Sequence, residues 1–173
     1  MAGDKGKIII EAGENELGEE RKKRDAVRML AFSLGDENYC ADIRDIKEVV
    51  RITGITRVPG IPWFVIGVMN LRGEIISLID IRHFFGLRQK ELTNESRVIV
   101  TDVKGESIGI VVDRIKGALY VEEESVQPTL ATIKGKLADY TKGQVKSGDE
   151  ILALLDLEKI LGCEEIEALR GGQ

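Results

Sequence analysis

Short apolar segments alternate with polar turn residues along most of the chain, starting at Met29. From Met29 to Leu34 the larger apolar side chains occupy every second position, which is the period of a strand with one buried face. The tetrapeptide Gly35-Asp36-Glu37-Asn38 has the composition of a tight turn. We therefore expect a hairpin here, with a second strand from Tyr39 to Ile43.

The same reasoning predicts six further strands. Each is a run of β-branched or other apolar residues bounded by turn-forming residues. They cover Val65 to Met69, Glu74 to Ile79, Arg97 to Val103, Ser107 to Val112, Ala118 to Val121 and Ile151 to Leu155. Many short strands at this spacing favour a barrel or a sandwich over an open parallel sheet.

Helical signals are few. Asp80 is a candidate N-cap and Gly86 a candidate C-terminal glycine, so a short helix can form between them. From Asp156 to Arg170 the apolar residues recur at roughly helical spacing, with a break near Gly162. The sequence therefore predicts a mainly β protein with two short helices at its C-terminal end.

The segment 1–27 differs in composition from the rest of the chain. It mixes basic and acidic side chains with several glycines and has a single apolar cluster, Ile8 to Ile10. Such a segment buries too little apolar surface to offset the entropy lost on ordering. We expect 1–27 to be a flexible charged tail.

Composition also narrows the classes of partner. The chain has 25 basic and 30 acidic side chains, a net charge of -5, which disfavours nucleic acid and anionic membranes as partners. Cys40 and Cys163 have no second thiol or histidine nearby in sequence, so neither a disulfide framework nor a zinc site is indicated. No apolar segment is long enough to span a bilayer. These features favour a cytoplasmic protein that binds other proteins and does not insert into a membrane.

No catalytic motif is visible in the sequence. The one histidine, His83, has no serine or cysteine nucleophile motif beside it, and the glycines form no phosphate-binding loop. Helix capping accounts for Asp80 and Asp156. Trp63, the only tryptophan, is expected to anchor its loop in the core. We expect no enzymatic activity and no cofactor.

The chain contains an internal repeat, which two alignments of the sequence on itself reveal. In the first alignment 28–49 lies without a gap on 97–118, and in the second alignment 67–86 lies without a gap on 143–162. Most apolar positions match in both alignments, and the two occur in the same order along the chain. The sequence therefore predicts two similar β units.

One turn differs between the two copies. Asn70-Leu71-Arg72-Gly73 aligns on Lys146-Ser147-Gly148-Asp149, although the flanking strands agree. Asparagine tolerates the left-handed backbone and glycine adopts positive φ without a clash, so the turn itself does not require Arg72. A guanidinium held on a short loop suits a bidentate contact with a carboxylate of a partner.

Seven short motifs follow one another in a defined order. They are Phe32-Ser33-Leu34-Gly35, Ile46-Lys47-Glu48-Val49-Val50-Arg51, Thr56-Arg57-Val58-Pro59, Gly67-Val68-Met69-Asn70-Leu71-Arg72-Gly73, Asp80-Ile81-Arg82, Gly109-Ile110-Val111-Val112-Asp113 and Leu154-Leu155-Asp156-Leu157. In this order the motifs closely resemble the CheW family of chemotaxis coupling proteins, over about Arg28 to Gly162.

The resemblance implies a fold of two SH3-like five-stranded β-barrel subdomains around a shared core, with some strands exchanged between them. The implied CheW-like domain covers 28–162, with subdomains at approximately 28–88 and 89–162. The segment 163–173 is expected to form a C-terminal helix and tail.

The resemblance also implies a function. Proteins of this family join the cytoplasmic tips of methyl-accepting chemoreceptors to the C-terminal regulatory domain of the histidine kinase CheA. Glu48 and Arg72 stand where the family places exposed partner-contact groups, and Gly73 belongs to the same turn. Ile46 and Gly67 are also carried over, although Ile46 could belong to the core and Gly67 could serve only close strand packing.

We further expect a groove between the barrels, lined by Val98, Val100 and Val111, to take the helical hairpin of a receptor. Two alternatives stay open at this point. An SH3-like module would bind Pro-rich peptides through an aromatic groove, and an OB-like module would bind single-stranded nucleic acid.

Overall fold

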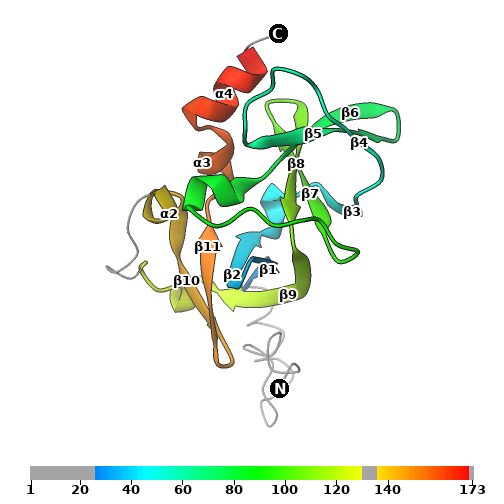
Figure 1. Ribbon diagram of the computed structural model, residues 1–173. Helices are drawn as coiled ribbons and strands as arrows, with labels where there is room; N and C mark the ends of the chain where they lie inside the picture. The colour runs from blue at the N-terminus through cyan, green and yellow to red at the C-terminus, as the bar shows by residue number, and fades with distance from the viewer. Residues whose placement is uncertain (1–25, 130–135, 172–173) are drawn as a thin grey trace.

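The computed structural model describes residues 26–129 and 136–171 (Figure 1). The strands are β1 (Ala26–Leu34), β2 (Glu37–Asp42), β3 (Glu48–Arg51), β4 (Ile55–Thr56), β5 (Val65–Leu71), β6 (Glu74–Ile79), β7 (Arg97–Val103), β8 (Glu106–Val112), β9 (Arg114–Glu122), β10 (Thr141–Ser147) and β11 (Glu150–Leu155). The helical elements are the 3-10 helices η2 (Ile43–Asp45), η3 (Ile81–Phe85) and η4 (Glu123–Ser125) and the α-helices α2 (Lys136–Asp139), α3 (Leu157–Leu161) and α4 (Glu164–Gly171).

The fold is mainly β, as predicted, and the short helices α3 and α4 end the described chain. The expected tail over 1–27 lies outside the described residues except for Ala26 and Val27, which begin β1. Among the described helices, none has the length and apolar character needed to cross a membrane.

The strands form two sheets. One has the order β10-β11-β2-β1-β9, and the other has the order β3-β7-β8-β6-β5-β4. Hairpins supply the antiparallel pairs β1–β2, β5–β6, β7–β8 and β10–β11, whereas β2–β11 and β6–β8 are parallel pairs between strands far apart in the sequence.

The two sheet orders match the internal sequence repeat. The first alignment places β1, β2 and β3 on β7, β8 and β9, and the second places β5 and β6 on β10 and β11. Under this correspondence the order β10-β11-β2-β1-β9 becomes β5-β6-β8-β7-β3, which is the second sheet without β4. Each sheet therefore contains strands from both halves of the chain. The predicted boundary near residue 88 therefore separates the two copies of the sequence repeat but does not separate the two sheets. The bounds of the subdomains stay a prediction.

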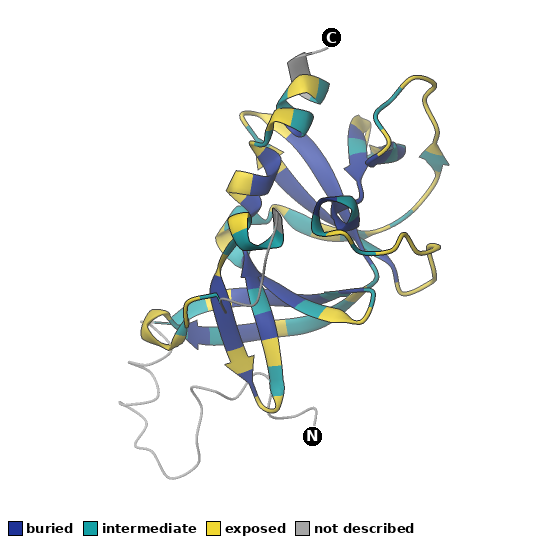
Figure 2. Cartoon of the chain, turned by 60° about the vertical axis from the view of Figure 1, so that its left-hand side comes forward, coloured by how far each residue is buried: buried dark blue, intermediate teal, exposed yellow. Residues whose placement is uncertain are grey.

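Central strands are buried on both faces, which creates three apolar clusters. In β7, Ile99 lies in a large cluster shared by the two sheets, whereas Val98 and Val100 lie in a smaller cluster enclosed by the six-stranded sheet. In β1, Phe32 belongs to the shared cluster and Met29 to a cluster enclosed by the five-stranded sheet. Figure 2 shows this burial as dark blue along the central strands, with exposed residues on turns and outer helix surfaces.

The expectation that Val98, Val100 and Val111 line a receptor groove is wrong. Their exposed fractions are 0%, 0% and 1%. A strand with only one buried face would leave alternate side chains available to a partner. Both faces of β7 and β8 are instead covered, one by the shared core and one by the core of their own sheet, so these valines stabilise the fold.

Two equivalent glycines allow an outer segment to approach each sheet closely. A Cβ atom at Gly67 would lie 2.5 Å from the carbonyl oxygen of Thr56, and a Cβ atom at Gly143 would lie 2.4 Å from that of Gln127. The close contact at Gly67 allows β4 to pair with β5. The close contact at Gly143 lies beside an isolated β-bridge between Gln127 and Gln144. Gly67 is buried, so close strand packing, one of the two roles considered for it, accounts for this glycine.

Candidate partner-binding site

Arg72 lies at the tip of the β5–β6 hairpin. Leu71 and Glu74 are paired across the hairpin, so Arg72 and Gly73 are the two central residues of the turn, with φ of 50° and 88°. Positive φ at both positions defines a type I′ turn, whose twist matches that of the flanking strands. The Asn70 side chain accepts a hydrogen bond of 2.9 Å from the Gly73 N–H, and Gly73 is exposed.

Arg72 itself occupies a left-handed position that we expected asparagine or glycine to fill. The β7–β8 turn has the same design, with φ of 52° at Lys104 and 88° at Gly105. There the Asp102 side chain accepts a hydrogen bond of 2.9 Å from the Gly105 N–H. Because glycine would adopt this φ without strain, the turn tolerates an arginine at its tip but does not favour one.

Arg72 and Glu48, which the sequence indicated as separate contact residues, form an ion pair with each other. The Arg72 Nη2 donates to Glu48 Oε2, and the two side chains are 67% and 27% exposed. The hydrogen bond from Arg72 lowers the pKa of Glu48, and the same bond raises the pKa of Arg72. Glu48 begins β3, an edge strand, so the pair joins parts of the six-stranded sheet that are not neighbours in it.

The other half of the chain has no counterpart of this ion pair. The residue equivalent to Glu48 is Gly117, and the residue equivalent to Arg72 is Gly148. The five-stranded sheet nevertheless forms with the corresponding strand order. The fold therefore does not depend on the pair.

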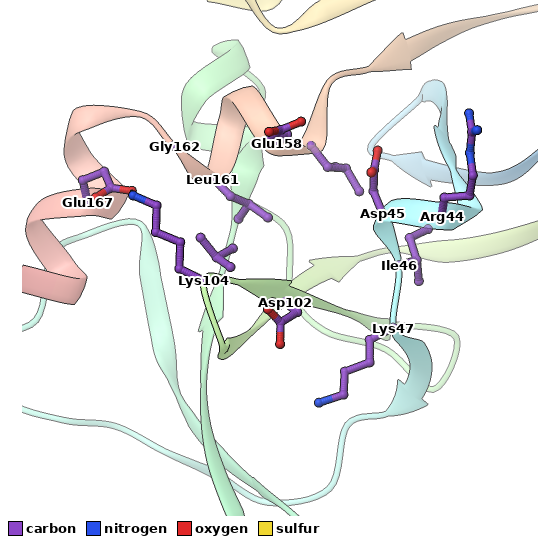
Figure 3. Close-up of a pocket in the computed structure, with 12 residues that line it drawn as sticks. Arg44, Asp45, Ile46, Lys47, Asp102, Lys104, Glu158, Leu161, Gly162 and Glu167 are labelled. Atoms are coloured by element: carbon purple, nitrogen blue, oxygen red, sulfur yellow. The ribbon is translucent and has the colours of Figure 1, made fainter.

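A groove of about 840 Å³ lies on another part of the surface, next to Ile46 (Figure 3). It is formed by η2 and the residues after it, the β7–β8 turn, and helices α3 and α4. Ile46 is half-buried. It packs against the shared core and also lines the groove, so it is both a core residue and a surface residue. The apolar lining residues are Ile46, Val103, Leu157 and Leu161, and the charged ones are Arg44, Asp45, Lys47, Asp102, Lys104, Glu158 and Glu167.

Charged groups at the groove differ in how they are compensated. The Arg44 side chain donates to Asp42, with Nη2 at 2.6 Å and Nε at 3.0 Å. Although desolvation raises the pKa of Asp42, the hydrogen bonds from Arg44 outweigh it and lower that pKa overall. Burial raises the pKa of Asp45, and the neighbouring carboxylates Asp42 and Glu158 add to this increase.

A buried ion cluster, centred on Arg82, was not predicted from the sequence. Arg82 is 1% exposed, and its guanidinium donates to Asp80 at 2.8 and 2.9 Å and to Asp113 at 3.0 Å. Asp113 also accepts a hydrogen bond from the N–H of Gly35, so the cluster ties η3 to the β1–β2 turn and to the end of β8. Asp80 acts as the expected cap of η3, accepting from the Arg82 N–H at 3.0 Å. The available signal was the Asp-Ile-Arg pattern, which also occurs at 42–44.

The expectation that Trp63 anchors its loop in the core is wrong, because Trp63 is 66% exposed. Its ring meets that of His83 edge-on, with 4.5 Å between ring centroids. The buried Nε2 of His83 has no hydrogen-bond partner within the part of the chain that the structure describes. In the same residues, no group of three or more His, Cys, Asp or Glu side chains is arranged to hold a metal ion.

The sequence profile of the CheW-like domain matches residues 28–165. This chain belongs to the CheW family. The chemotaxis protein CheW of Treponema pallidum is 33% identical over 146 residues, which cover 82% of this chain and 86% of that protein. CheW of Helicobacter pylori is 32% identical over 137 residues, covering 79% of this chain and 82% of the relative.

The solved structures include a similar CheW fold. The scaffolding protein TtCheW of Thermoanaerobacter tengcongensis superposes with a TM-score of 0.71 at 30% identity, covering 81% of this chain and 95% of that one. These relatives are chemotaxis proteins, and the similar solved structure is that of a scaffolding protein. The family, the fold and the chemotaxis scaffold function predicted from the sequence motifs are confirmed, and a Pro-rich peptide or a single-stranded nucleic acid as the ligand is not favoured.

Proposed function

We propose that the protein couples the cytoplasmic tips of methyl-accepting chemoreceptors to the regulatory domain of the histidine kinase CheA by binding both at once. The observation that supports this most directly is the Glu48–Arg72 ion pair. The pair is exposed, its Arg72 occupies a turn position with positive φ, and the counterparts of both residues in the other half are glycines. A charge pair that the fold does not need is well explained by a role in recognition.

We assign the kinase module to the surface around this pair. Val49 and Ile75, which flank Glu48 and Arg72 closely in sequence, are 38% and 62% exposed. Exposed aliphatic side chains on the strands that carry the charge pair can supply apolar area to a protein interface, whose rim is polar. A standard interface buries about 800 Å² on each partner, which leaves most of the surface of a chain of this size for a second one.

We assign the receptor to the groove beside Ile46, in place of the groove first expected along the valines of β7 and β8. Its lining combines the apolar Ile46, Leu157 and Leu161 with charged side chains of both signs. This lining suits an amphipathic helix that buries one apolar stripe and pairs its flanking charges. The receptor tip is a helical hairpin, so one of its helices is the proposed occupant.

Coupling then follows from simultaneous binding. When receptor and kinase are held on one rigid protein, the effective concentration of each near the other replaces free diffusion. No covalent step is needed, so we propose that the protein has no enzymatic activity of its own. The site of action is the cytoplasm, where the receptor tips and the kinase meet.

The experiment is a three-component binding assay with purified full-length protein, a receptor signalling-tip fragment and the CheA regulatory domain. Size-exclusion chromatography with light scattering should show both binary complexes and one ternary complex. Displacement of one partner by the other would contradict simultaneous binding. Failure of the wild-type protein to bind either partner would contradict the coupling function itself.

A further inference from the structure

Two equivalent lysines have different surroundings in the two halves of the chain. The alignment of 28–49 on 97–118 places Lys47 on Lys116. Lys116 is 15% exposed, and its Nζ lies 2.9 and 3.1 Å from the two carboxylate oxygens of Glu150 and 3.1 Å from Asn38 Oδ1. Its charge is therefore compensated by a carboxylate inside the molecule.

Lys47 keeps only the neutral part of this arrangement. Its Nζ donates at 3.2 Å to the hydroxyl of Ser107, a buried residue that is equivalent to Asn38. The residue equivalent to Glu150 is Glu74. Over residues 26–129 and 136–171, however, Lys47 forms no ion pair with Glu74 or with any other carboxylate.

The adjacent turn also differs between the two halves. In the five-stranded sheet, the turn residue two positions before Glu150 is Gly148, which carries no charge. In the six-stranded sheet the same position is Arg72, and Glu74 contributes to the raised pKa of its guanidinium. Glu74 thus acts on Arg72 through its charge, whereas no ion pair joins it to Lys47.

Lys47 also differs from the other cations of the groove (Figure 3). Arg44 is held by Asp42 at 2.6 Å, and Lys104 lies 3.9 Å from Glu167. Lys47 lines the same groove with a hydroxyl as its only hydrogen-bond partner among the described side chains. The neighbouring Glu48 is hydrogen-bonded to Arg72, and Lys47 acts on it only through its charge, which helps to lower the pKa of Glu48. The groove wall therefore presents one cation that lacks the ion-pair partner of its counterpart.

We propose that Lys47 receives a carboxylate from the helix that occupies the groove, in the way that Lys116 receives Glu150. This assignment rests on the proposed function and adds the chemistry of its receptor site. The partner helix carries an aspartate or glutamate on the flank of its apolar stripe, at the position that faces Lys47 when the stripe packs on Ile46 and Leu161. The pair fixes the register of the helix in the groove, because a shift by one turn moves the carboxylate by about 5 Å.

The test is the affinity of the full-length protein for a receptor signalling-tip fragment, measured by isothermal titration calorimetry at low and moderate salt. Lys47→Glu should weaken binding by about tenfold or more, because it replaces an attraction with a repulsion. Lys47→Arg should stay within about threefold of wild type, and Lys47→Ala should fall between the two. The loss for Lys47→Ala should shrink as salt rises. Lys146→Glu is the matched control, since Lys146 is exposed on β10 outside the groove lining.

A charge reversal on the partner completes the test. Each acidic residue of the receptor fragment is changed to lysine, and one of these variants should restore binding to Lys47→Glu while weakening binding to wild type. Thermal unfolding of every variant checks that the fold is intact, and Lys47→Ala carries the test if Lys47→Glu unfolds. Wild-type binding together with unchanged affinity for Lys47→Glu and Lys47→Ala would overturn the role of Lys47 and leave the coupling function standing. Absence of wild-type binding would instead overturn the receptor assignment on which the role rests.

Discussion

Glu48 and Arg72 lie 24 residues apart in the sequence, yet their side chains form an ion pair on the surface of the six-stranded sheet. One comes from an edge strand and the other from the tip of a hairpin on the far side of that sheet. Each residue is therefore the hydrogen-bond partner of the other at this surface. A substitution at either position changes the surface that both present to a partner, so their effects on binding are not independent.

Arg72→Glu should leave the thermal midpoint and the circular dichroism spectrum near those of wild type but abolish receptor-dependent activation of the kinase. The pair is exposed and solvent-screened, so it contributes little to folding, whereas two adjacent carboxylates would disrupt the contact surface. Kinase activity in receptor-containing membranes measures the effect. Unchanged activation would show that the contact is misassigned.

Reversing the charge at Glu48 should weaken one binary complex more than the other, because the proposed kinase and receptor surfaces are separate. We expect the larger loss with the kinase regulatory domain, since Glu48 pairs with Arg72 and is not among the residues lining the groove. Calorimetric titrations with each partner give the two affinities. Equal losses, or none, would count against an interface at Glu48.

Gly67→Ala and Gly143→Ala should both destabilise the fold, because each new Cβ would meet a backbone carbonyl oxygen at 2.5 or 2.4 Å. Neither oxygen can move without disturbing the strand pairing beside it, so we expect losses of about 1–3 kcal/mol. Urea unfolding measures them. Gly54→Ala is the control, because nothing lies within 4 Å of its added Cβ, and its midpoint should stay near wild type.

Arg82→Met should destabilise the protein by about 3–5 kcal/mol, because it leaves the buried Asp80 and Asp113 without their cation. Arg44→Met is a matched control in the same Asp-Ile-Arg pattern, where the arginine side chain is 71% exposed. Its unfolding midpoint should change far less. If both variants lost similar free energy of unfolding in urea, the buried ion cluster of Arg82 would not be more important for stability than the exposed pair of Arg44.

Alkaline pH should destabilise the protein through Cys40 and Tyr39. Burial raises the pKa of Cys40 from 9.0 to about 12 and that of Tyr39 from 10.0 to about 12. The folded state therefore binds these protons more tightly than the unfolded state, and the stability they confer is fully present below pH 9 and falls as the pH rises toward 12. Urea midpoints at pH 8, 10 and 11 measure the trend, and a constant midpoint would contradict it.

The same burial should protect Cys40 from alkylation. Because the thiolate is the reactive form, iodoacetamide at pH 8 should leave Cys40 unmodified in the folded protein. Cys163 is only partly buried and should react first, although its pKa is also raised. Mass spectrometry of peptides identifies the modified cysteine, and unfolding in urea should make both react.

Alternating apolar residues located most of the sheet structure correctly. All eight predicted strands are present, and the largest difference is at β9, which begins at Arg114 rather than near Ala118. The undetected strands β3, β4 and β10 are short or polar, and tertiary pairing rather than hydrophobic period holds them in place. The caps Asp80 and Asp156 were predicted correctly because capping depends on local sequence.

The site was harder to predict, because its geometry depends on contacts between distant segments. The motifs indicated Glu48 and Arg72 but not that they pair. The valines of β7 and β8 were misplaced because alternation does not reveal that a shared core covers their second face. The groove beside Ile46 combines residues from four separate elements, and no local pattern brings those elements together.

The apolar cluster shared by the two sheets has a mechanical consequence for the proposed coupling. A rotation of one sheet against the other would open the apolar cluster that both sheets share, and it would strain the two chain connections between them, β2–β3 and β8–β9. Under the proposed function, a displacement of one bound partner would therefore reach the other through movement of the whole body. Two domains joined by a linker would instead absorb that displacement in the linker.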